Sequence, residues 1–300
     1  MVDKSIAIAM LARDCEKSLR HNIPKIEKLR SFFNNSIVVV VENDSVDQTK
    51  TILSEWSRTA KNVIVLSEDY HTLTIPLKTV ECPYPKGSKY RIDKLSFYRN
   101  KYMEYLKGND IDCDYLMVID IDINDFSIDG IMETLNTAPS DWTALFANGN
   151  RYIINFFNHH QINIMYYDSY AFVPYLLNNE NKVIELTYTE LAINQKKLFN
   201  QLKKNNFVKC ISAFGGIGLY KYAYIKGNKY YSIANKRSSL VEVTSEHVMY
   251  NMKISTKYIS KKMLVYYNEV KSIKEIVYDS LPLNIKMLLF RIKKGYPFPV

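Results

Sequence analysis

Runs of apolar residues separated by polar turns fill the first 120 positions of the chain. Four short runs, rich in Ile, Val and Leu, predict buried strands at Ile6–Leu11, Ile37–Val41, Val63–Leu66 and Tyr115–Ile119. Each run is nearly continuous rather than alternating, which is typical of strands that are covered on both faces. This part of the chain therefore predicts a largely parallel sheet between two layers of helices.

The segments between these runs carry apolar residues at helical spacing. The first predicted helix covers residues 19–29, where Pro24 is expected to break or restart it. A polar turn at 42–45 is expected to cap a second helix that runs to Ala60. A third helix, Tyr90–Leu106, follows a proline-containing loop. The order is strand, helix, strand, helix, strand, loop, helix, strand.

The second half of the chain has a weaker pattern. Residues 144–157 and 162–172 are expected to form strands or loops, and Leu186–Leu202 a helix. Val208–Gly218 is expected to be one strand that leads into a glycine turn, and Tyr258–Tyr267 a late strand or helix. We find no internal repeat and no linker, which favours a single domain over residues 1–260 with an extension at 261–300.

The extension holds a segment in which apolar and basic residues are spaced as on an amphipathic helix. This segment covers 276–294 and lies around Pro282. Two interpretations stay open: a terminal helix docked on the core, or a peripheral contact with an anionic membrane surface.

Composition narrows the class of protein. The chain has 300 residues, 47% of them apolar, and a formal net charge of +9. Its four cysteines include no C-x-x-C pair, and no apolar run approaches the roughly 18 residues of a spanning helix. These features predict a globular protein with reduced thiols, in the cytoplasm or peripherally on the inner face of a membrane. The basic residues are scattered, so we expect a phosphate-bearing small molecule as partner and no nucleic acid.

Two carboxylates follow the fourth predicted strand. Asp120 and Asp122 are two residues apart, so on an extended chain they share one face at a separation of about 6.6 Å. Such carboxylates repel each other unless a cation lies between them, and oxygen ligands suit Mg²⁺ or Mn²⁺. The alternative is a simple acidic turn. A dehalogenase-type phosphatase is excluded because Asn124 departs from its motif and no later acidic pair follows.

Five landmarks follow one another along the chain: the first strand with Ala12-Arg13-Asp14, V-E-N-D-S-V-D-Q-T at 41–49, R-x₇-R-N at 91–100, D-x-D at 120–122 and S-E-H at 245–247. In this order they resemble a GT-A glycosyltransferase. The chain looks most like the fungal capsule-associated α-mannosyltransferase family, over about residues 5–260. Its metal motif is D-I-D-I-N-D, whereas we associate an N-D-V form with the fungal enzymes. The identity of the transferred sugar is therefore left open.

The resemblance implies an α/β GT-A fold with a mixed sheet flanked by helices, a nucleotide-sugar donor, a glycan or lipid-linked acceptor, and Mn²⁺ or Mg²⁺. It also implies a set of donor-binding residues: Glu42, Asp44, Arg91, Arg99 and Asp120. An alternative role for Glu42 and Asp44 is to cap the following helix. The alternatives for Arg91 and Arg99 are to buttress the D-x-D strand or to form structural ion pairs.

The resemblance assigns the remaining roles to the second half of the chain. Asp168, Gly215 and Gly216 are expected at the acceptor site, although a tight turn with positive φ also explains the glycines. Glu246 resembles the base of an inverting enzyme, and retention stays open. His247 is expected to complete the metal site with Asp120 and Asp122, or to be structural. On a strand Glu246 and His247 would point in opposite directions.

Two other functions were weighed against sugar transfer. A nucleotidyltransferase would need a basic glycine-rich loop after the first strand, which residues 12–14 do not supply. A glycan- or nucleotide-binding module without catalysis is the third hypothesis, and nucleoside diphosphate release would distinguish it from the enzyme.

Overall fold

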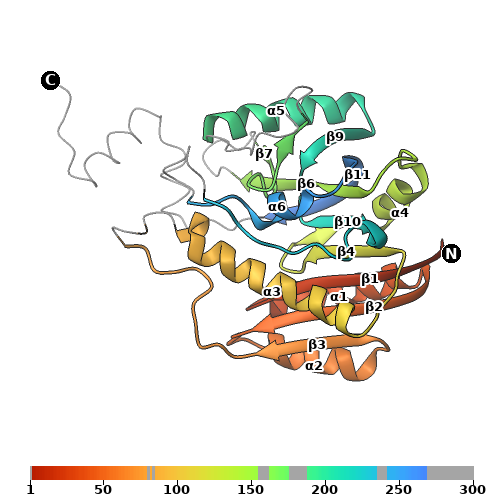
Figure 1. Ribbon diagram of the computed structural model, residues 1–300, viewed down its shortest axis with the longest axis vertical. Helices are drawn as coiled ribbons and strands as arrows, with labels where there is room; N and C mark the ends of the chain where they lie inside the picture. Colours follow the sequence, from red (N-terminus) through yellow and green to blue (C-terminus); the bar gives the residue numbers. More distant parts are fainter. Residues whose placement is uncertain are drawn as a thin grey trace.

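The computed structural model describes residues 2–79, 82, 85–154, 162–175, 188–234 and 242–268. Over these ranges the chain forms one mixed sheet with helices on both of its faces (Figure 1). The basic helix expected at 276–294 lies outside the described residues, as do 155–157 and 186–187 of two other predicted segments. The expected α/β class is confirmed.

The first half of the sheet consists of parallel strands, as predicted. The four strands lie in the spatial order β3-β2-β1-β4. Their bounds are β1 (Val2–Ala12), β2 (Phe33–Asn43), β3 (Val63–Glu68) and β4 (Tyr115–Asp120). The connecting helices are α1 (Glu16–Arg30), α2 (Thr49–Thr59) and α3 (Lys89–Gly108), and a short 3₁₀ turn, η1 (Pro85–Gly87), precedes α3.

The expected break at Pro24 is wrong, because α1 continues through it. A proline inside a helix costs about 3 kcal/mol through the missing N–H and the ring clash. Three side chains of α1, Leu19, Ile26 and Leu29, are fully buried against the sheet. Burial of each contributes about 1.5–3 kcal/mol, so packing outweighs the cost of the proline.

The expected capping of α2 by the 42–45 turn is also wrong. The helix starts only at Thr49, and Asp47 accepts the backbone N–H of Thr49 through Oδ1 at 2.9 Å. Asp44 has a φ of 51° and accepts the backbone N–H of His71 at 2.7 Å instead. The turn therefore connects the loops that follow β2 and β3, which is a contact between segments distant in sequence.

The second half of the chain completes the sheet. Its elements are β5 (Asp125–Phe126), α4 (Ile128–Thr137), β6 (Ala144–Ile154), β7 (Ile162–Tyr166), β8 (Val173–Pro174), α5 (Tyr188–Lys204), β9 (Phe207–Ser212), β10 (Ile217–Lys221), η2 (Tyr222–Tyr224), α6 (Glu246–Asn251) and β11 (Lys257–Asn268). Within the described residues the order is β3-β2-β1-β4-β10-β6-β11-β9-β8, with β5 on β11 and β7 on β6. Strand β10 runs antiparallel to β4 and β6, whereas β11 runs parallel to β6.

Two expectations for this half need correction. The segment 208–218 is not one strand, because β9 ends at Ser212 and β10 begins at Ile217 on a different part of the sheet. Glu246 and His247 open helix α6 instead of lying on a strand. Residues 257–268 form a strand, β11, which crosses position 260, so the sheet extends to Asn268. The division into a domain and an extension stays a prediction.

The sheet separates two layers of core. Ile6, Ile8 and Met10 of β1 pack with α1, α2 and α4 on one face. Ala7 and Ala9 lie on the other face with the side chains of α3, α5 and α6. The small alanines leave room for the large tyrosines of that layer, such as those of α3. None of the helices in the described ranges is long and apolar enough to cross a bilayer.

Candidate active site at the carboxyl ends of the strands

The candidate site is centred on the end of β4, where the two halves of the chain meet. The backbone N–H of Asp120, the last residue of β4, donates to the carbonyl of Gly216 at 2.9 Å. That glycine lies in the turn before β10, the antiparallel neighbour of β4. In sheets of this kind ligands bind outside the carboxyl ends of the parallel strands.

Both carboxylate oxygens of Asp120 have a donor. Arg99, on α3, donates through Nη2 to Oδ1 at 3.3 Å, and the Tyr167 hydroxyl donates to Oδ2 at 3.2 Å. Arg99 also donates through Nε to Oε1 of Glu246 at 3.1 Å. The side chains of Arg99 and Glu246 are almost completely buried. A single guanidinium thus connects the D-x-D motif with the S-E-H motif.

Asp122 has different surroundings. Its side chain is exposed, and in the described part of the chain no other side chain bonds to it. The surrounding protein nevertheless displaces enough water to raise the pKa of its carboxyl to about 6, with repulsion from Asp120 as the second cause. Burial also raises the pKa of Asp120. The site therefore holds two neighbouring carboxylates with raised pKa values, and the carboxylate of Asp122 is accessible to a ligand.

These two carboxylates fit a divalent cation. A cation between them would offset the burial that raises the pKa of both carboxyls and the repulsion from Asp120 that adds to it at Asp122. Mg²⁺ or Mn²⁺ is commonly bound by one or two carboxylates with water and phosphate oxygens. Among the described residues, no three Asp, Glu, His or Cys side chains lie close enough together to hold a metal. The expected triad of Asp120, Asp122 and His247 is therefore not assembled in this structure.

His247 is buried against aromatic rings. Its ring stacks on Phe214 with 3.9 Å between centroids, and neither ring nitrogen has a hydrogen-bond partner in the described ranges. Burial, followed by the charge of Arg99, lowers its pKa well below the ordinary value. The neutral imidazole packs beneath the site, which agrees with the structural alternative for this residue.

The two arginines of α3 have different environments. Arg99 is buried between Asp120 and Glu246, which agrees with the buttressing role considered from the sequence. Arg91 is half-buried and donates through Nη1 to the carbonyl of Lys86 at 3.0 Å. Its Nε has no hydrogen-bond partner in the described ranges, and its charge lowers the pKa of Asp122. In the described ranges both arginines keep one guanidinium nitrogen without a partner, Nε of Arg91 and Nη1 of Arg99, and Arg91 is the more exposed of the two.

Glu42 and Asp44 organise the loop after β2. Glu42 is buried; its carboxylate accepts the Ser45 backbone N–H at 2.9 Å and the Ser67 hydroxyl. Burial tends to raise the pKa of Asp44, but hydrogen bonds from Asn43 and from loop backbone N–H groups lower it overall. The Arg13 guanidinium lies 3.5 Å from the Asp44 carboxylate. Both acids lie at the carboxyl end of β2 and bond to neighbouring loops, so their role in donor binding stays a prediction.

The residues predicted for the acceptor site lie near Asp120: the Gly216 carbonyl accepts its backbone N–H, and its charge acts on Asp168. Gly215 and Gly216 have φ values of 63° and 92°, and a Cβ on Gly215 would lie 2.4 Å from the Ala147 carbonyl oxygen. Positive φ and lack of space therefore both require this turn to be glycine. Asp168 is half-buried with a φ of 56°. Burial and then the charges of Asp120 and Glu246 raise its pKa well above the ordinary value.

Sequence reasoning missed Tyr167 as a site residue. Its hydroxyl contacts Asp120 and its ring stacks on Tyr267, with 4.6 Å between centroids. With 24 tyrosines in the chain, no local signal distinguishes this one. Only the pairing of β7 with β6 brings it to the end of β4.

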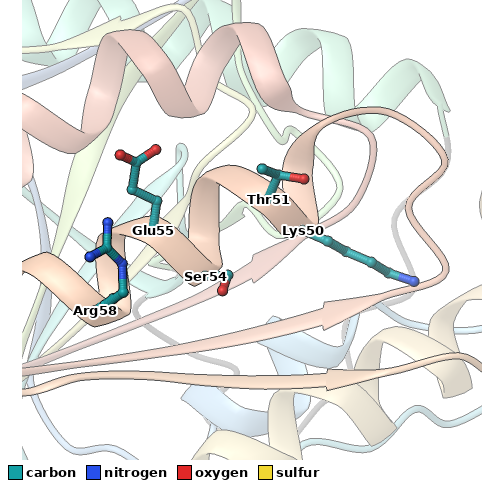
Figure 2. Close-up of a pocket in the computed structure, with 5 residues that line it drawn as sticks. All are labelled: Lys50, Thr51, Ser54, Glu55 and Arg58. Carbon is teal, nitrogen blue, oxygen red and sulfur yellow. The ribbon is translucent and has the colours of Figure 1, made fainter.

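A shallow hollow on the surface lies apart from this cluster. Figure 2 shows five side chains along helix α2 that line it: Lys50, Thr51, Ser54, Glu55 and Arg58. The hollow contains none of the residues predicted for the site.

Comparison with known proteins identifies the family. Residues 5–229 match the family model described as Cryptococcal mannosyltransferase 1. No curated protein matches the chain.

Solved structures with similar architecture include TarS residues 1–349 from S. aureus, at 14% identity and a TM-score of 0.45 over 92% of this chain and 62% of that one. The mannosyltransferase PcManGT from Pyrobaculum calidifontis, in complex with GDP-Man and Mn²⁺, aligns at 9% identity and a TM-score of 0.44, over 89% of this chain and 57% of that one. The chain thus spans less than two thirds of these structures. The family match, which covers three quarters of the chain, confirms the resemblance to a GT-A type glycosyltransferase: the chain belongs to the cryptococcal mannosyltransferase 1 family.

Proposed function

We propose that this protein is a metal-dependent glycosyltransferase that moves a sugar from a nucleotide-sugar to a glycan or lipid-linked glycan, with inversion at the anomeric carbon. The single observation that carries the proposal is the pair of carboxylates at the end of β4, with Asp120 held by two donors and Asp122 unpaired by other side chains. Family membership supports sugar transfer as the reaction.

Asp120 and Asp122 would hold the cation, which would offset the charge on the departing nucleoside diphosphate. Arg99 and Tyr167 fix the Asp120 carboxylate before substrate arrives, so that little reorganisation is needed during the reaction. Arg91 supplies a second positive charge on the same side, with one donor unpaired in the described ranges. The nucleoside would lie along the loops after β1, β2 and β3, which Arg13 and Asp44 connect.

An inverting reaction needs a base for the acceptor hydroxyl, and two carboxylates are candidates. Glu246 was expected in this role, but it is buried and paired with Arg99. As a base it would have to exchange this ion pair for a contact with the acceptor. Asp168 is half-buried and therefore more accessible than Glu246, and its raised pKa strengthens its carboxylate as a proton acceptor.

Substitution of each carboxylate distinguishes the two. Loss of the base should abolish transfer to an acceptor and leave slow donor hydrolysis by water, because the cation site is intact. We expect this split for either Glu246→Gln or Asp168→Asn, and the variant that shows it identifies the base. Retention of full transfer by both variants would contradict a protein base and hence the inverting mechanism.

The proposed function is tested by incubating the protein with a panel of nucleotide-sugars, GDP-mannose among them. We expect release of nucleoside diphosphate from at least one donor with Mn²⁺ or Mg²⁺, and none after addition of EDTA. Release that is equal with EDTA would contradict metal dependence. A protein that binds a donor but releases no diphosphate from any would be a binding module.

A further inference from the structure

Tyr167 occupies a slot that two glycines make. Its backbone N–H donates to the Gly149 carbonyl at 2.9 Å. A Cβ on Gly149 would lie 2.9 Å from the Cβ of Tyr167, and one on Gly216 would lie 3.2 Å from its ring. Tyr267, on β11, stacks on the ring with an interplanar angle of 28°. Three separate segments therefore determine where the Tyr167 ring lies.

The placement of the ring directs its hydroxyl to one oxygen of Asp120. The hydroxyl bonds to Oδ2, while Arg99 bonds to Oδ1, so each oxygen receives one donor. A carboxylate has about four acceptor positions, which leaves free positions on Asp120 for a cation. Asp122 has no comparable side-chain donor in the described ranges. The pair is thus asymmetric, with one carboxylate fixed and the other free.

We propose that Tyr167 is a positioning residue, whose hydroxyl holds the Asp120 carboxylate in the orientation that binds the divalent cation shared with Asp122. This inference rests on the metal site of the proposed function. Carboxylates that bind metals are in turn oriented by hydrogen-bond donors, and loss of such a donor costs about 10- to 100-fold in metal affinity.

A competing physical effect acts in the opposite direction. A phenol that bonds to a carboxylate withdraws electron density from it and occupies an acceptor position, so its removal alone would strengthen cation binding. Orientation and competition therefore predict opposite signs for the same substitution. The sign of the measured change decides between them.

The test is to titrate metal-free protein with Mn²⁺ and to measure the affinity by isothermal titration calorimetry. We expect Tyr167→Phe to bind Mn²⁺ about 10- to 100-fold more weakly than the unsubstituted protein. Tyr166→Phe is the matched control: it removes a neighbouring tyrosine hydroxyl, which bonds to the Ala147 carbonyl and not to Asp120, and should leave the Mn²⁺ affinity unchanged. At saturating Mn²⁺, Tyr167→Phe should recover much of its kcat, since the defect is in metal occupancy.

Tyr267→Leu provides a second variant that keeps the hydroxyl but removes the stacked ring. It should weaken Mn²⁺ binding by less than Tyr167→Phe does. Unchanged or tighter binding by Tyr167→Phe would overturn the positioning role while leaving the metal site in place. Absence of Mn²⁺ binding by the unsubstituted protein would overturn the proposed metal site itself.

Discussion

The two sides of the candidate site contribute different things. The side built by the parallel strands of the first half supplies two carboxylates at the carboxyl end of β4, the half-buried Asp120 and the exposed Asp122. The side built by the second half supplies partners for it: the Tyr167 hydroxyl, the Gly216 carbonyl and, through Arg99, Glu246. Chemistry-bearing groups thus lie on a local motif, whereas their orientation depends on contacts between distant segments.

The largest expected effect comes from removing the residue that connects the two sides. Arg99→Ala would remove the arginine that pairs with the buried Glu246 in the described ranges, and Asp120 would lose one donor. Removal of one partner from a buried ion pair costs about 3–5 kcal/mol. We expect a loss of this size in the free energy of unfolding, measured by urea denaturation, together with loss of activity.

Arg58→Ala is the control for this substitution, because Arg58 lies exposed on α2 (Figure 2). It should change the free energy of unfolding by no more than about 0.5 kcal/mol. If Arg99→Ala were as stable as this control, the guanidinium would not be what holds the two sides together.

A substantial effect is also expected at the glycine turn. Gly215→Ala would force an alanine to a φ of 63° and place its Cβ 2.4 Å from a backbone oxygen. Strain and overpacking each cost about 1–3 kcal/mol, so we expect destabilisation of about 2–6 kcal/mol by thermal or chemical unfolding.

Gly227→Ala is the matched substitution, since nothing lies within 4 Å of the Cβ that it would add. It should be nearly neutral. Equal stability of the two alanine variants would mean that the turn tolerates a side chain, and that the contact between Gly216 and Asp120 is not a rigid one.

The smallest expected effect is a change in stability on substitution of Asp122. The pKa of Asp122 is about 6 in the folded protein, above its value of 3.8 in the absence of these neighbours. A raised pKa means that the folded state disfavours the charged form, so this group lowers stability as pH rises from about 4 to about 6. Asp122→Asn removes that penalty.

In metal-free buffer with EDTA we therefore expect Asp122→Asn to melt at a higher temperature than the unsubstituted protein at pH 7, with the difference shrinking as pH falls toward 4.5. Differential scanning fluorimetry over this range measures it. A difference that is independent of pH would show that the pKa of Asp122 is not raised in the folded protein.

The first half of the fold follows from the sequence because its signals are local. The apolar runs of β1 to β4 and the D-x-D motif each lie within one short segment, and the structure confirms the strands and the α/β class. The break expected at Pro24 failed because propensity is weaker than the burial of Leu19, Ile26 and Leu29 on the sheet.

The side chains that contact the site carboxylates could not be predicted from local patterns. Arg99 and Glu246 lie 147 positions apart, and Tyr167 lies 47 positions from Asp120. No periodicity carries information about such pairs, which depend on how β7 and β10 enter the sheet. The S-E-H motif was recognised in the sequence, but its secondary structure was predicted wrongly. Helix α6 has only six residues, which is too short to show a helical pattern.

The central claim is that Asp120 and Asp122 carry a metal-dependent transfer from a nucleotide-sugar. The most direct measurement is the initial rate of nucleoside diphosphate release, with Mn²⁺ and the best donor, for Asp120→Ala, Asp122→Ala and the exposed control Asp129→Ala. We predict a loss of at least about 100-fold for the first two, in line with removal of a principal electrostatic contact, and an unchanged rate for the third. Full turnover by Asp120→Ala or Asp122→Ala would contradict the account.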